Sequence, residues 1–141
     1  MNTFCVTLSS LAVVAVVSYA VGVEQGEKRA NGRIFELRTY TAAPGKMAAL
    51  NARFRDHTCK LFEKHGMTNI GYWNPADPKE TDKKLIYIVA FPSQEAADKS
   101  WKSFGADPEW KTVHETSEKD GGLVEKVEHV FLHPTDYSPL K

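Results

Sequence analysis

The segment from Phe54 to Gly66, "FRDHTCKLFEKHG", holds several side chains that can transfer protons or bind metals. Its two histidines, His57 and His65, are eight residues apart, and neither an HxxxH nor an HxxEH pattern joins them. At about 100° per residue, Cys59 lies about 160° around a helix from His57 and faces away from it. No histidine lies on the side of Cys59, although a thiol nucleophile needs a base beside it. The segment therefore predicts neither a metal site nor a cysteine nucleophile.

His57 lies at the border of the apolar stripe of this predicted helix, about 70° from the centre of the stripe. An imidazole at that border can look into a cleft between helix and sheet, where histidine is suited to proton shuttling. The structural alternative is a boundary histidine that hydrogen-bonds a backbone carbonyl or a carboxylate. Both interpretations stay open, and His57 is the candidate catalytic residue. His65 lies in the last helical turn, where we expect it to cap carbonyl groups and favour the helix dipole.

Two further histidines, His129 and His133, share one face of the last predicted strand but are about 13 Å apart. This separation is too large for one ion, so a metal site would need ligands from across the fold. The two cysteines, Cys5 and Cys59, are far apart and form no CxxC pattern, which argues against a disulfide framework or a zinc knuckle. We therefore predict no metal and no cofactor.

Glu36, Arg38 and Tyr40 form a polar row on one face of the first predicted strand. Side chains two residues apart on a strand are about 7 Å apart, so Arg38 can contact Glu36. If this face is interior, the charges must be paired. They can pair with each other or across a dimer, or they can bind an anionic or polar ligand. Arg38 and Tyr40 are therefore candidate ligand-binding residues.

Four large aromatic side chains, Tyr72, Trp73, Trp101 and Trp110, follow outside this row. Residues of this kind anchor cores and interfaces. One or two of them can instead wall a flat apolar ligand. On that interpretation Tyr72, Trp73 and Trp110 join the candidate ligand-binding residues.

The elements that must position these side chains alternate between two hydrophobic periods. Apolar residues alternate with polar ones over 33–42, whereas 46–65 has helical spacing and ends at Gly66. Strands are also predicted at 67–74, 85–91 and 124–133, and helices begin after Ser93 and again after Asp107 with Pro108 at the first helical position. The order strand, helix, strand, strand, helix, strand predicts an α+β, ferredoxin-like βαββαβ domain with a four-stranded antiparallel sheet.

Helices would cover one face of this sheet and leave the other without a cover. The segment 85–91, "LIYIVAF", is continuously apolar, which is typical of a strand buried on both faces. Its exposed side would form a large apolar patch in a monomer, so we predict a sheet-on-sheet homodimer. The 18 basic residues balance the 18 acidic ones and form no basic stripe, which argues against nucleic acid as a partner.

The first 23 residues contain no charged side chain and are rich in Val, Ala and Leu. They are expected to be a signal peptide that is cleaved after Ala20, where "SYA" places small residues at the cleavage site. The alternative is an uncleaved N-terminal membrane anchor, since the run is about as long as a bilayer is thick. Both interpretations predict an exported protein, periplasmic or secreted. Residues 24–32 form a polar linker, 33–134 the domain and 135–141 a C-terminal tail.

Several separated motifs resemble those of the NIPSNAP family. They are "FELRTYTAAPGK" (35–46), "FRDHTCKLFEKHGM" (54–67), "YWN" (72–74), the pattern W..F..DPEW (101–110) and "PTDYSPL" (134–140). The resemblance implies a dimeric α/β barrel built from ferredoxin-like halves. It implies no particular reaction, because the wider superfamily includes cofactor-free monooxygenases, heme-using enzymes, isomerases and binding modules.

These observations lead to one hypothesis and one alternative. The hypothesis is an exported NIPSNAP-like homodimer that binds a small hydrophobic or aromatic molecule between helix and sheet. Any chemistry would be proton abstraction or cofactor-free oxygenation, with His57 as the base and Tyr40 or Trp73 orienting the ligand. The alternative is a non-enzymatic interaction or scaffold module whose aromatic residues only build the dimer.

Overall fold

A computed structural model describes residues 32–141, so the predicted export segment, most of the linker and Cys5 lie outside the described residues. The strands are β1 (Ile34–Ala42), β2 (Thr68–Trp73), β3 (Lys84–Phe91) and β4 (Val124–Leu132). The helices are α2 (Met47–Arg53), the π-helical turn η1 (Phe54–Thr58), α3 (Cys59–Lys64), α4 (Gln94–Ala106) and α5 (Pro108–Glu118). Among these helices, none has the length and apolar character that a membrane span requires.

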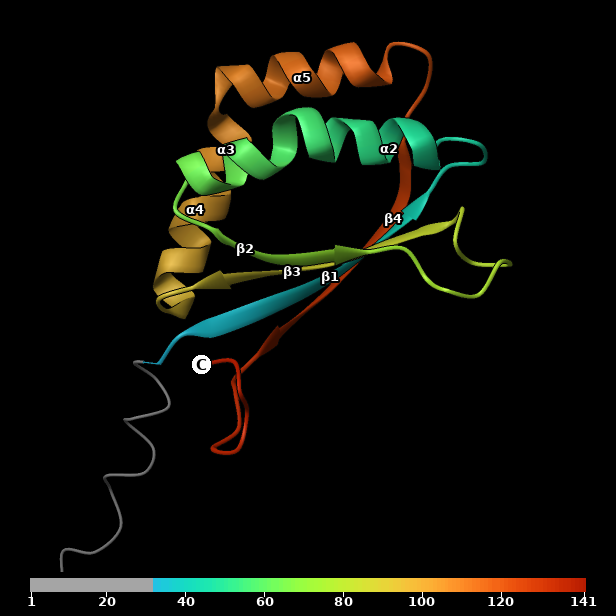
Figure 1. Ribbon diagram of the computed structural model, residues 1–141. Helices are drawn as coiled ribbons and strands as arrows, with labels where there is room; N and C mark the ends of the chain where they lie inside the picture. Colours follow the sequence, from blue (N-terminus) through green and yellow to red (C-terminus); the bar gives the residue numbers. More distant parts are fainter. Residues whose placement is uncertain (1–31) are drawn as a thin grey trace, which may run out of the picture.

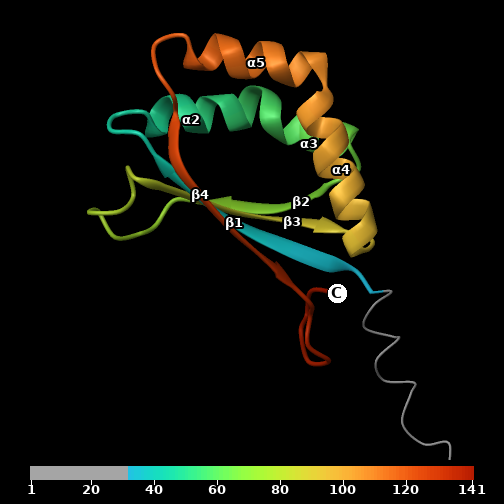
Figure 2. The same cartoon turned by 180° about the vertical axis from the view of Figure 1, so that it is seen from behind.

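The four strands form one antiparallel sheet in the order β2-β3-β1-β4. The helices lie on one side of this sheet, and α5 runs along α2 in a layer farther from β2 and β3 (Figure 1). In the view from behind, the described helices again lie on one side of the sheet, and the C-terminal tail lies on the other (Figure 2). The predicted ferredoxin-like α+β fold is confirmed, with the second helical segment divided into α4 and α5.

The alternation in β1 separates an inner face, covered by the helices, from an outer face. On the inner face, Glu36 lies opposite Val89 of β3 and Phe131 of β4, and Arg38 and Tyr40 follow on the same side. The core packs here, between the buried side chains of β3 and those of the helices. The predicted polar row therefore lies in the interior, between the sheet and the helix layer.

Helix ends occur where the sequence predicted them. Gly66 has φ +81°, a left-handed conformation that glycine tolerates, and it follows the last residues of α3. The Ser93 hydroxyl accepts a hydrogen bond from the Ala96 N–H at 3.2 Å and caps α4. The Asp107 carboxylate accepts one from the Glu109 N–H at 2.8 Å, with Pro108 at the start of α5.

The helix from Met47 to Lys64 departs from the regular spacing that the sequence analysis assumed. Its middle turn, η1, is a π-helix, which holds more residues per turn than an α-helix, and residues 55–57 within it are exposed. The direction of a side chain after Arg53 therefore no longer follows about 100° per residue. Arg53, which the regular spacing places off the apolar stripe, is buried and only 5% exposed.

Candidate functional site

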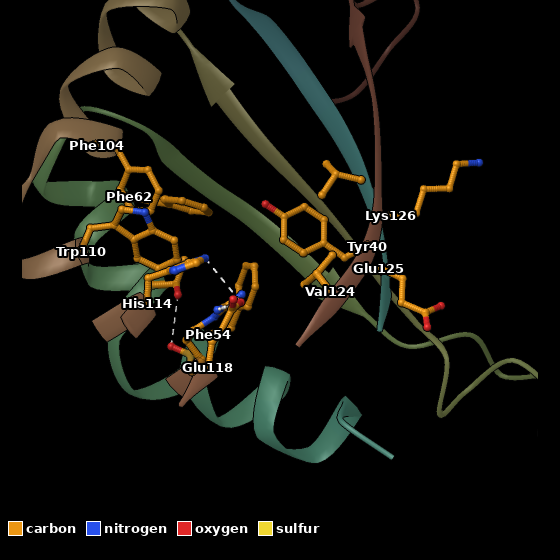
Figure 3. Close-up of a pocket in the computed structure, with 13 residues that line it drawn as sticks. Tyr40, Phe54, Phe62, Phe104, Trp110, His114, Glu118, Val124, Glu125 and Lys126 are labelled. Carbon is orange, nitrogen blue, oxygen red and sulfur yellow. Dashed lines mark hydrogen bonds and ion pairs between the residues drawn. The ribbon is translucent and has the colours of Figure 1, made fainter. Parts of the chain in front are cut away.

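A cavity of about 270 Å³ lies between the sheet and the helix layer, beside the edge strand β4. In Figure 3, Tyr40 of β1 points from the sheet toward Phe62, Phe104 and Trp110 on the helices. Val124 and Val127 of β4 complete the sheet wall, and Phe54 lies on the wall that η1 forms. The lining residues come from β1, from the start of β4 and from the helical segments that face them.

The aromatic walls of the cavity are held in place by ring contacts. The Tyr40 ring meets the Phe54 ring edge to face at 5.8 Å and the Tyr87 ring at 5.4 Å. Across the cavity, Phe104 and Trp110 pack against each other with ring centroids 4.5 Å apart. Such pairs add about 0.5–1.5 kcal/mol beyond the area they bury, so the walls are preorganised.

A polar rim closes the helix side of the cavity. The Arg53 side chain is 4% exposed, and its Nη1 donates to Glu118 Oε1 at 2.9 Å. Its guanidinium lies 5.4 Å from the centre of the Trp110 ring, while its Nε is buried without a hydrogen-bond partner in residues 32–141. His114 Nε2 lies 3.4 Å from the same Glu118 oxygen. The rim therefore offers a guanidinium and an imidazole to a polar ligand group.

The polar row of β1 forms a second cluster next to the cavity. Glu36 is fully buried, and its Oε1 accepts a hydrogen bond from Arg38 Nη1 at 2.9 Å. Its Oε2 accepts one from the Trp101 indole N–H at 2.6 Å, and His129 Nδ1 lies 2.9 Å from Oε1. The Arg38 guanidinium stacks over the Trp101 ring at 4.2 Å. The predicted contact between Arg38 and Glu36 is confirmed, and the buried charge is paired as the interior requires.

The structure brings only some of the sequence-predicted site residues together. Tyr40 and Trp110 line the cavity, and Arg38 lies two residues along β1 from Tyr40 on the same face. Tyr72 is instead half-buried against the core, where its ring stacks on Tyr87 at 5.3 Å and its hydroxyl donates to Asn69 Oδ1 at 2.5 Å. Burial raises the pKa of Tyr72, so the phenol stays protonated.

Trp73 lies away from the cavity and is 50% exposed. Its ring covers Gly71, because a Cβ on that glycine would lie 2.5 Å from the indole. Together with Tyr72 and the half-buried Cys59, it borders a separate hollow at the β2 edge. Burial raises the pKa of the Cys59 thiol, which keeps it in the poorly nucleophilic protonated form.

The placement expected for His57 is wrong. Its side chain is exposed and borders a groove of about 460 Å³ between two helical segments, with Val113 and Thr116 on the α5 side, rather than a cleft between helix and sheet. Residues 55–57 are all exposed, whereas Phe54 and Thr58 on either side of them are buried. His65 has a structural role, but it does not cap carbonyl groups as expected: Nε2 meets Asp107 Oδ2 at 2.7 Å and Nδ1 meets Ser103 Oγ at 2.9 Å.

The residues of the polar rim were not predicted from the sequence. Trp110, His114 and Glu118 are spaced by four residues and share one face of α5, a pattern that could have marked them as neighbours. No comparable signal links His129 to Glu36, because their contact depends on the register between β1 and β4. Within residues 32–141, no three His, Cys, Asp or Glu side chains form a group that could hold a metal ion.

Comparison with known proteins identifies relatives of the whole domain. A family model described as NIPSNAP matches residues 35–139. A NIPSNAP family protein of unknown function from Agrobacterium tumefaciens superposes with a TM-score of 0.67 at 23% identity, covering 79% of this chain and 96% of that one. A NIPSNAP-like domain protein from Burkholderia xenovorans gives 0.67 at 17% identity, covering 77% and 90%. SnoaB from Streptomyces nogalater, described as a cofactor-independent oxygenase, gives 0.56 at 16% identity, covering 77% and 98%. No curated protein matches the chain.

Proposed function

Because the chain belongs to the NIPSNAP family, with residues 35–139 matching, we propose that it binds a small aromatic molecule in the cavity between helices and sheet. The observation that carries this proposal is the lining of the cavity, with rings from β1, η1, α3, α4 and α5 around about 270 Å³. Small-molecule sites are concave, mostly apolar and equipped with a few polar groups. This cavity has aromatic and aliphatic walls, and its polar groups come from Arg53, Thr58, His114 and Glu118 on the helix side and from Glu125 and Lys126 of β4. Its volume suits a molecule of one or two rings.

The chemistry we propose for the bound molecule is proton transfer or cofactor-free oxygenation. This part of the proposal is supported by fold likeness to SnoaB, whose description names a cofactor-independent oxygenase. Tyr40 and Trp110 would orient the ring of the ligand from opposite walls. His57, which lies outside the cavity, is not suited to act as the base for a molecule bound there.

We also propose that a second copy of the chain covers the outer face of the sheet. Phe35, Leu37 and Ile88 share that face with Val130 and Leu132, by the register of β1 with its neighbours. The last two side chains are 47% and 40% exposed in the single chain. A monomer that exposed such a face to water would be prone to association.

Export of the protein is part of the same proposal and is supported by the sequence alone. Residues 1–23 would act as a signal peptide cleaved after Ala20, or as an uncleaved membrane anchor. Intact-mass spectrometry of the protein recovered from its native cells separates these outcomes. Loss of residues 1–20 would support cleavage, whereas the full mass in a membrane fraction would support the anchor.

The binding proposal is tested by filling the cavity. Saturation-transfer NMR would measure binding of phenol and indole to the wild type, to Val127→Trp and to a matched control. Val127 is 42% exposed on the cavity wall, so an indole there would occupy the space of the ligand. Lys111→Trp places the same side chain on the exposed surface of α5, outside the lining. We expect Val127→Trp to lose binding and the control to retain it.

Two outcomes would count against the binding proposal. Unchanged binding by Val127→Trp would place the ligand elsewhere. No binding of either probe to the wild type would favour the second candidate function, a homodimeric scaffold module. The apolar outer face around Val130 is the observation that supports this alternative.

A further inference from the structure

A buried carboxylate holds a half-exposed imidazole on the inner face of the sheet. Glu36 is fully buried, whereas the side chain of His129 is 51% exposed, and the two meet with Nδ1 2.9 Å from Oε1. The other carboxylate contacts come from Arg38 and from Trp101, so the position of Glu36 is set from three sides. A carboxylate held in this way can orient the ring of its neighbour.

The contact determines which nitrogen of His129 can accept a proton. Nδ1 lies 2.9 Å from a carboxylate oxygen, so electrostatic attraction to the negative charge favours the tautomer of the neutral ring that carries its proton on Nδ1. Nε2, the outer nitrogen, then has a free lone pair. Orientation of a histidine by a buried carboxylate is how a general base is commonly prepared.

His129 and Arg38 lie next to the cavity. Val127 and Tyr40 are opposite each other in the register of β4 with β1 and both line the cavity, whereas His129 and Arg38 are the next pair on the same face. This step of two residues is about 7 Å, the length of a single substituted ring. Arg38 is only 15% exposed, and its Nε is buried without a partner in the described part of the chain.

We propose that His129, positioned by Glu36, accepts the proton of a phenolic or enolic O–H group on the molecule bound in the adjacent cavity. This inference rests on the proposed function, because it names the substrate class of that cavity. The O–H bond of the ligand breaks, its electron pair stays on oxygen, and the proton forms the new N–H bond on His129 Nε2. The products are an imidazolium beside Glu36 and an oxyanion beside Arg38. The positive charges of Arg38 and His129 then balance the negative charges of Glu36 and the ligand oxyanion.

His114 is the competing histidine, because it lines the cavity directly. Its outer nitrogen, Nε2, is the one that faces Glu118, at 3.4 Å, and that carboxylate already accepts a hydrogen bond from Arg53. The nitrogen left for a ligand would be Nδ1, which lies close to the backbone of α5. In His129 the nitrogen that faces the carboxylate is instead Nδ1, so Nε2 is the nitrogen left for the ligand.

The test uses 4-nitrophenol as the probe, because its ionised form absorbs visible light and reports proton transfer separately from binding. At a pH where the free probe is mostly protonated, we expect the full-length wild-type protein to bind it in the ionised form. His129→Gln should still bind the probe but lower its ionisation constant in the complex about tenfold or more, because the cation that pairs with the oxyanion is lost. Glu36→Gln should act in the same direction. His133→Gln, at the end of β4 and outside the cavity, should behave as the wild type.

Each outcome bears on one proposal. An unchanged ionised fraction in His129→Gln would overturn the assignment of the proton acceptor, and loss of ionisation in His114→Gln alone would transfer that role to His114. Failure of the wild type to bind the probe would count against the cavity as a binding site. In that case the pairing of Glu36 with His129 is tested without a ligand, by long-range ¹H–¹⁵N NMR, which reports the tautomer of the imidazole. We expect the Nδ1–H tautomer of His129 in the wild type and a mixture in Glu36→Gln; an Nε2–H tautomer in the wild type would refute the inference.

Discussion

Removing Glu36 alone is predicted to destabilise the protein more than removing Glu36 and Arg38 together. The substitution Glu36→Leu takes away the acceptor of two hydrogen bonds, from Arg38 at 2.9 Å and from Trp101 at 2.6 Å. It also leaves the Arg38 guanidinium, 15% exposed, without its counter-ion. Breaking a buried pair in this way costs about 3–5 kcal/mol, because one charge stays buried without compensation. The contact to His129 adds little, because that half-exposed ring can be rehydrated.

The double substitution Glu36→Leu/Arg38→Leu removes both charges. The Trp101 indole N–H then lacks its acceptor, a loss of about 1–3 kcal/mol, while the half-exposed His129 ring is rehydrated as in the single variant. Urea unfolding followed by circular dichroism at one protein concentration measures both values, since dimerisation would make stability depend on concentration. A single variant that is no less stable than the double variant would refute the reasoning. The charges would then be hydrated in the native protein rather than paired.

Three further predictions concern other surfaces of the molecule. Val130→Asp on the outer face should convert a dimer into a monomer in sedimentation velocity, whereas Val127→Asp on the inner face should not; a wild type that is monomeric at micromolar concentration would defeat the dimer proposal. His57→Ala should change the free energy of unfolding by no more than about 0.5 kcal/mol and leave the binding of phenol and indole intact, because the residue is exposed and outside the cavity. Loss of that binding would restore His57 as a site residue. The Lys64 ammonium, the His65 imidazole and the backbone N–H at the start of α5 hold the pKa of Asp107 below its ordinary value. The contribution of the Asp107 carboxylate to stability is therefore complete above about pH 4 and is lost as the pH falls toward the lowered pKa. Asp107→Asn should be less stable than the wild type at neutral pH and approach it in acid. Curves of unfolding free energy against pH that run parallel for the two proteins would contradict this.

Much of the fold could be predicted because its signals are local. The alternation from Ile34 to Ala42 separates an inner from an outer face, and this follows from the two-residue period of any strand. The ends of α4 and α5 were predictable from Ser93, Asp107 and Pro108, since caps act on backbone groups within the next three residues. These local patterns do not depend on how distant segments of the chain pack.

The site could be predicted only in part, because its residues meet through packing between distant elements. Arg53 is buried because it packs against Trp110 and Glu118 of α5, whereas His57 is exposed, and the spacing of apolar residues within one helix contains no sign of either. Tyr40 and Trp110 were identified as aromatic candidates, but their position on opposite walls depends on how α5 lies over the sheet.

The sequence by itself determined which residues form each element, which face of β1 is polar, and the family to which the chain belongs. Only the tertiary structure decided which charges are neighbours. Glu36 and His129 are far apart in the chain, and the antiparallel register of β1 with β4 brings them to 2.9 Å. A shift of that register by one residue would turn His129 to the outer face and leave Glu36 without it. The physical reason is that periodicity is set by the backbone of one segment, whereas a site depends on how several segments pack.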